Sequence, residues 1–164
     1  MSIKRVEFPN HVIIPIIIEE LHKGHTATLN LRGWSMRPFL EHDRDKALLC
    51  LPDKVKVGDP VLAEVPALKG EGTRYVLHRI TRIEGEEVTL RGDGNLGDEH
   101  CQLKDIKAAV VGFYRKGRTK MDHTDGWKWR TYSWWWMRLT PIRRYLLAFH
   151  RRIWLKIFKP KIRQ

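Results

Sequence analysis

The sequence predicts a mainly β protein of the β-rich α+β class: an antiparallel sheet with a leading helix and a basic helical tail. Short segments of alternating apolar and polar residues recur between residues 26 and 114, and Gly, Asp and Pro turns separate them. One segment with helical spacing precedes them. After Gly126 the composition changes, with 11 Lys and Arg and no Asp or Glu as far as Gln164. These three observations define the predicted architecture.

The leading helix is expected over residues 11–22. Asn10 can cap its start, Gly24 suits its end, and Pro15 is expected in or near the first turn, where proline is tolerated. Its apolar positions recur at helical spacing: Ile13, Ile14, Ile17, Ile18 and Leu21.

The strands are expected in the segments that follow. The stretch TATLNLR alternates, which predicts a strand that leads into Gly33. A long hairpin is expected over residues 74–93, with its turn at Glu84-Gly85. Further strands are expected at 46–51, 60–65 and 106–114.

The chain is expected to divide into a β-domain at 1–114, a polar linker at 115–126 and a helical tail at 127–164. In the tail, Thr140 and Pro141 are predicted to start a helix, with Thr as the N-cap. An apolar stripe follows, which leaves Leu147 and Leu155 outside it: Ile142, Tyr145, Leu146, Phe149, Ile153 and Ile157.

Composition narrows the class of protein. Hydrophobic residues make up 42% of the chain, enough for a packed core, and two cysteines do not make a disulfide framework. No signal peptide is visible, and the apolar run Val12–Ile18 is too short to span a bilayer. These features predict a cytoplasmic protein.

The formal net charge of +12 is unevenly placed. Residues 1–125 hold 20 Lys and Arg against 19 Asp and Glu, so the excess lies in the tail. Such an asymmetry indicates an anionic partner, either a membrane or a nucleic acid.

Ser35 lies between Trp34 and Met36, where a predicted strand ends. Gly33 permits an unusual backbone conformation, and Pro38 prevents a regular ladder from continuing. Such a turn can expose a hydroxyl beside a free backbone N–H. A serine nucleophile needs a base, and His78, on the strand YVLHRI, is the best candidate.

The loop RGDGNLGDEH supplies carboxylates that could orient a histidine: Asp93, Asp98 and Glu99. Its glycines spell GxGxxG, but no helix pattern follows and the acids would repel a pyrophosphate. It also lacks EF-hand spacing. The pairs His22/His25 and His100/Cys101 have no four-ligand spacing, so no metal and no cofactor is expected.

The ordered boxes GWSMRP, VGDPV, VLHRI and GDGN resemble the signal peptidase/LexA-like clan of serine peptidases. The resemblance covers roughly residues 25–114. It implies a LexA/signal-peptidase-like antiparallel β-fold. A histidine as base resembles the endoplasmic-reticulum, archaeal and sporulation-type signal peptidases.

The resemblance implies a role for each matching position. Ser35 is the nucleophile, and its main-chain N–H helps to form the oxyanion hole. His78 is the base, and Asp98 and Asp93 complete the site, with Glu99 as an alternative to Asp98. The implied activity is a serine endopeptidase that cleaves a peptide or protein precursor through an acyl-enzyme. The alternative is a non-catalytic membrane- or protein-binding module that retains the fold.

The tail is the main departure from the family pattern, whose signal peptidases usually carry an N-terminal membrane helix. Its aromatic and basic residues suit peripheral contact with the inner face of an anionic membrane. A helical pair that caps the β-domain is the other interpretation, and nucleic acid is an unfavoured third, since no defined nucleic-acid motif is present. The predicted membrane-surface residues are Trp127, Trp129, Trp134, Trp135, Trp136, Arg143, Arg144, Arg151 and Arg152.

Overall fold

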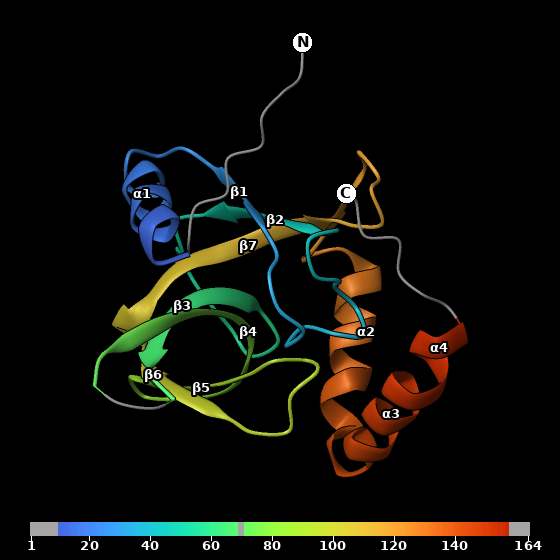
Figure 1. The fold of residues 1–164 in the computed structure, drawn as a ribbon. Helices are drawn as coiled ribbons and strands as arrows, with labels where there is room; N and C mark the ends of the chain where they lie inside the picture. The colour runs from blue at the N-terminus through green and yellow to red at the C-terminus, as the bar shows by residue number, and fades with distance from the viewer. Residues whose placement is uncertain (1–9, 69–70, 158–164) are drawn as a thin grey trace.

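The computed structural model describes residues 10–68 and 71–157 (Figure 1). It is mainly an antiparallel sheet with a leading helix and C-terminal helices, as the alternation and the tail composition predict. The β-domain elements are α1 (Asn10–His22), β1 (Ala27–Asn30), β2 (Lys46–Cys50), β3 (Pro60–Pro66), β4 (Thr73–Glu84), β5 (Glu87–Arg91), β6 (Glu99–Gln102), the 3₁₀ turn η1 (Leu103–Asp105), β7 (Ile106–Tyr114) and β8 (Met121–His123). The C-terminal elements are α2 (Trp127–Arg138), the 3₁₀ turn η2 (Thr140–Ile142), α3 (Arg143–Phe149), the π-helical turn η3 (His150–Trp154) and α4 (Leu155–Ile157).

Within the described residues the strands form one sheet in the order β1-β2-β7-β3-β4-β5-β6, and β8 pairs with β7. Every pairing is antiparallel. The register breaks between Leu48 and Leu49, between Leu62 and Ala63, and between Ile80 and Arg82. Such irregularities bend a strand and increase its twist, which allows the sheet to curve around a core.

Two apolar clusters fill that core. One joins α1 to β1, β2 and β7, with Ile14, Leu21 and Phe113 fully buried. The other lies among β3, β4 and β5 around Val61 and Ile80. The helical spacing of α1 and the alternation of the strands place these side chains inward, so hydrophobic burial drives both layers together.

The predicted strands are confirmed, but two were missed. β6 is four residues long and contains only one apolar residue, Cys101, and β8 lies inside the segment expected to be a linker. Both gain their order by pairing with a neighbouring strand rather than from their own pattern. Pro15 also lies deeper in α1 than expected, beyond its first turn.

The tail is packed against the β-domain. Trp129 of α2 belongs to the first apolar cluster and lies 4.8 Å, ring centre to ring centre, from Phe113. Ser133 and Trp136, about one and two turns further along, are also buried. In Figure 1, α2, α3 and α4 lie together on one side of the strands. No helix among residues 10–68 and 71–157 is both long and apolar enough to cross a bilayer.

The start of the second tail helix differs in detail from the prediction. Thr140 begins the 3₁₀ turn η2, and its hydroxyl donates to the carbonyl of Met137, 2.6 Å away, instead of capping the helix that follows. The predicted apolar stripe is also turned outward. Leu147, expected outside the stripe, is the buried residue, while Tyr145 and Phe149 are exposed.

Candidate active site

A buried ion pair connects three of the four sequence boxes. Arg79, next to His78 on β4, donates to both carboxylate oxygens of Asp93 at 2.9 and 2.7 Å. Its third contact is with the carbonyl of Gly58 at 2.8 Å, in the VGDPV box. Both members of the pair are about 1% exposed, so each needs the other to offset the cost of burial.

The fourth box, GWSMRP, contacts the GDGN loop at the glycines of that loop. The N–H of Gly94 donates to the carbonyl of Ser35 at 2.7 Å, which ties the GDGN loop to the serine turn. A Cβ on Gly92 would lie 2.5 Å from that same carbonyl oxygen and 3.0 Å from Nε2 of His78. The main chain of Ser35 and the imidazole of His78 therefore meet at Gly92, and only a residue without a side chain fits between them.

The other ring nitrogen of His78 faces a carboxylate. Nδ1 lies 2.6 Å from Oε2 of Glu99, and His78 is 3% exposed. Burial raises the pKa of Glu99, but the contacts with His78 and then Arg74 outweigh it, so the pKa lies below its ordinary value of 4.5. Glu99 is therefore an anion at neutral pH and can favour the Nδ1–H tautomer of His78, which leaves Nε2, on the Gly92 side of the ring, as the basic nitrogen. In the described residues Nε2 makes no hydrogen bond to the Ser35 hydroxyl.

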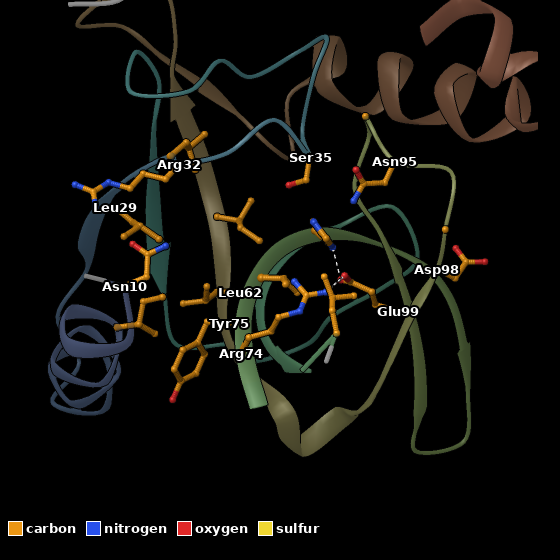
Figure 2. Close-up of a pocket in the computed structure, with 18 of the residues that line it drawn as sticks. Asn10, Leu29, Arg32, Ser35, Leu62, Arg74, Tyr75, Asn95, Asp98 and Glu99 are labelled. Atoms are coloured by element: carbon orange, nitrogen blue, oxygen red, sulfur yellow. Dashed lines mark hydrogen bonds and ion pairs between the residues drawn. The ribbon is translucent and has the colours of Figure 1, made fainter. Parts of the chain in front are cut away.

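Asp98 is not the carboxylate at the histidine. Its two oxygens accept from Arg91 at 2.5 and 2.6 Å, and Figure 2 shows its side chain directed away from Glu99. Glu99 is the first residue of β6, and successive side chains near a strand point in opposite directions. The alternation therefore turns Glu99 toward His78 on β4 and turns Asp98 toward Arg91, although both residues border the cleft.

Asp93 does not contact His78 either, because its carboxylate is used by Arg79. Tyr132 of α2 also donates to it at 3.1 Å, and the indole N–H of Trp136 donates to its main-chain carbonyl at 3.1 Å. Burial raises the pKa of Tyr132 well above 10, so its hydroxyl keeps the proton that it donates. Asp93 is thus the anchor of the loop and not a partner of the imidazole.

Ser35, His78 and Glu99 line one cleft of about 630 Å³ (Figure 2). Leu29, Leu62 and other apolar residues form much of its wall. Ser35 is half-buried, and Figure 2 shows its side chain directed into this space. A cleft of this size can accommodate a short stretch of extended peptide.

Three residues of the cleft were missed by sequence reasoning. Arg74 pairs with Glu99 across 25 positions, a separation that no local pattern reveals. The side-chain amide nitrogen of Asn95 would lie 2.9 Å from a Cβ on Gly92, and Nε2 of His78 would lie 3.0 Å from the same Cβ. The place of Asn95 in the GDGN box was the sequence signal that could have identified it as a residue of the cleft. Arg151, expected at a membrane, lines the cleft and donates to the carbonyl of Gly94 at 2.9 Å.

The structure divides the predicted membrane-surface residues into two groups. Trp129, Trp136 and Arg143 are buried against the domain, so the prediction for these three is wrong. Arg143 donates to the carbonyl of Trp136 at 2.7 Å. The residues that remain on the surface are Trp127, Trp134, Trp135, Arg144, Arg151 and Arg152.

Trp34, next to the serine, is half exposed. The guanidinium of Arg37 lies 3.8 Å from the centre of its ring, and the ring of His42 lies 4.7 Å away. These contacts hold the indole against the serine turn, although it is not among the residues that line the cleft of Ser35. Its neighbours in a smaller hollow include Arg151 and Leu147 of the C-terminal helices.

Among the described residues, no group of three or more His, Cys, Asp and Glu side chains is arranged to hold an ion. Burial, followed by nearby carboxylates, raises the pKa of Cys101 to about 11, so this cysteine is a protonated thiol at neutral pH.

Comparison of the chain with protein-family models, with curated proteins and with solved structures gives no match. The ordered boxes and the geometry that they adopt are therefore the features of the chain that point to a function.

Proposed function

We propose that this protein is a serine endopeptidase of signal-peptidase type with a LexA-like fold, in which Ser35 is the nucleophile. One observation carries the proposal: Nε2 of His78 and the carbonyl of Ser35 both border Gly92, while Nδ1 of His78 faces Glu99. The proximity of these groups supports a nucleophile, a base and an orienting carboxylate that together activate a serine hydroxyl.

The proposed reaction is acyl transfer. His78 accepts the Ser35 proton through Nε2 as the serine oxygen attacks a peptide carbonyl, and Glu99 stabilises the imidazolium. The imidazolium then protonates the leaving amine, and water, activated by the same histidine, hydrolyses the acyl-enzyme. The main-chain N–H of Ser35 is proposed to donate to the oxyanion. The substrate is a peptide or protein precursor that enters the cleft in an extended form.

The proposal is tested with the purified full-length protein and a complex peptide library, with products identified by mass spectrometry. Ser35→Ala and His78→Ala are each expected to reduce cleavage by about a thousandfold or more, because both groups act as one unit. Replacement of Thr28 by Ala, which removes an exposed hydroxyl on β1 outside the cleft, is the matched control.

Cleavage that persists in Ser35→Ala would contradict the mechanism. A folded wild-type protein that cleaves no library peptide and no co-expressed precursor would favour the alternative, a binding module that retains the fold. The exposed apolar surface of the C-terminal helices is the observation that keeps this alternative in consideration.

A further inference from the structure

The helical segment from Ile142 to Ile157 presents an apolar stripe to solvent. Its members recur every three or four residues, which places them on one face of the continuous helical run. Each is between 46% and 67% exposed: Ile142, Tyr145, Phe149, Ile153 and Ile157. Arg143 and Leu147, which are buried, use a different face to contact the rest of the protein. The stripe is thus left over after the segment has packed.

Basic residues accompany the stripe. Arg144, Arg152 and Lys156 are exposed, and each directly precedes a stripe residue in the chain. No acidic residue occurs after Asp125, while 11 Lys and Arg do. The surface therefore combines apolar side chains with uncompensated positive charge, which suits a partner that offers both hydrocarbon and anions.

Exposed aromatic residues extend this chemistry onto α2. Trp127, Trp134 and Trp135 are 74%, 48% and 56% exposed, and the guanidinium of Arg138 lies 3.7 Å from the ring centre of Trp134. Tryptophan and tyrosine concentrate where a membrane meets water, because an apolar ring and a polar edge are both satisfied there.

We propose that the stripe docks on the surface of an anionic lipid bilayer. The helical segment lies in the plane of the membrane, with Tyr145, Phe149 and Ile153 at the boundary of headgroups and acyl chains. The neighbouring Arg and Lys side chains contact lipid phosphates. Such binding gains from buried apolar area and from electrostatic attraction together.

The charge distribution disfavours the other occupants. A dimer formed through the stripe would bring two basic surfaces together with no acidic residue between them, which repels at low salt. A nucleic acid would use the cations and could stack on rings, but Ile142, Ile153 and Ile157 offer no flat face to a base. The aliphatic members of the stripe therefore favour lipid.

Docking would also bring the cleft close to the bilayer. Arg151 lies within the same helical segment as Ile153, and it lines the cleft and contacts Gly94. The docking proposal does not depend on peptidase activity, because its test measures binding alone.

The test is co-sedimentation of the full-length protein with vesicles. One set contains phosphatidylcholine alone, and the other contains about one third phosphatidylglycerol. The apolar variant replaces both Phe149 and Ile153 by Ser. Its control replaces Val12 and Ile16 by Ser, two exposed residues with the same four-residue spacing on α1.

We expect the wild-type protein to bind the anionic vesicles, less so at high salt, and the apolar variant to bind at least about tenfold more weakly. Replacing Arg152 and Lys156 by Gln should weaken binding about 25-fold at low salt, since each cation near an anionic surface contributes about fivefold. The α1 control, and a control that replaces Lys46 and Arg118 by Gln, should bind like the wild type. All replaced side chains are exposed, so every variant should melt like the wild type.

Equal binding by the apolar variant and the wild type would overturn the proposal, as would equal binding to the two kinds of vesicle. So would a dimer in size-exclusion chromatography that the apolar variant disrupts. Binding to a labelled oligonucleotide, without any binding to vesicles, would assign the surface to nucleic acid instead.

Discussion

At the scale of single residues, Gly92 sets the distance between the serine turn and the histidine strand. Its backbone dihedral is not one that needs glycine, so the restriction comes from space alone. A methyl group there would lie 2.5 Å from the carbonyl oxygen of Ser35, which is main chain and cannot rotate away. Relief would require the GDGN loop and the serine turn to separate.

We therefore expect Gly92→Ala to reduce peptidase activity strongly and to lower the free energy of unfolding by about 1–3 kcal/mol, the usual cost of overpacking. Gly97→Ala is the control, since nothing lies within 4 Å of its Cβ and its backbone dihedral is also ordinary. Urea unfolding and peptide cleavage measure the two effects. A Gly92→Ala protein with wild-type activity would show that the close contact at Gly92 has no functional weight.

Glu99 and Asp98 are neighbours in the chain but have different partners. The structure places Glu99 beside His78, whereas the family resemblance favours Asp98 as the residue that orients the histidine. Substitution of each residue therefore distinguishes the two assignments. Glu99→Gln is expected to reduce cleavage by about a hundredfold or more, because a neutral amide neither fixes the histidine tautomer nor stabilises the imidazolium. Asp98→Asn breaks only an ion pair with Arg91, so the loss should stay within about tenfold. The reverse order of the two losses would restore Asp98 as the orienting residue.

Glu99 should also make stability depend on pH. Its pKa is lower in the folded protein than the ordinary value of 4.5, so its contribution is complete above that value and is lost as the pH falls through the folded pKa. Urea unfolding of wild type and Glu99→Gln between about pH 6 and pH 3 should show the wild-type advantage shrinking on acidification. An advantage that grows toward low pH would contradict the assigned direction.

At the scale of helices and strands, the sequence predicts elements that bury their own apolar residues and misses those that do not. α1 and six strands, β1 to β5 and β7, are recognisable because alternation or helical spacing follows from facing a core. β6 and β8 have no such pattern, since each is ordered by hydrogen bonds to a longer neighbour. In the C-terminal helices the helical spacing was predicted correctly, but the face that packs against the protein was not. A helical period alone does not say which face is buried. Leu147 is buried while Phe149 is exposed.

In the candidate site, too, residues within local sequence motifs could be predicted, whereas residues that arrive from distant elements could not. Ser35 and His78 were identified from ordered boxes, and the structure brings them to one cleft. The partner of His78 required knowledge of where β6 begins, because a shift of one residue exchanges Asp98 for Glu99. Arg74 and Arg151 could not be found at all from the sequence, since each reaches the site from a distant element.

At the scale of the whole molecule, the tail is part of the structure that builds the site. Trp129 fills the first apolar cluster, Ser133 accepts from Arg79, and Trp136 donates to the carbonyl of Asp93. The expected division into β-domain, linker and tail describes the change in composition, but side chains of the tail pack into the core of the β-domain. The loop that carries Gly92 and Gly94 is held on one side by the serine turn and on the other by α2.

This packing predicts that the described part of the chain unfolds as one unit and that a change in α2 is felt throughout. Trp136→Phe keeps an aromatic six-membered ring but removes the five-membered ring and its N–H, which leaves a small cavity and the buried carbonyl of Asp93 without that donor. We expect a single unfolding transition whose free energy is lower by about 1–3 kcal/mol. Trp135→Phe, at an exposed position one residue away, should change the free energy of unfolding by less than about 0.5 kcal/mol.

The measurement is urea unfolding followed by both far-ultraviolet circular dichroism and tryptophan fluorescence. Coincident transitions in both probes would establish the single unit. Two separate transitions, with only one of them shifted by Trp136→Phe, would instead mean that the C-terminal helices are an independent appendage.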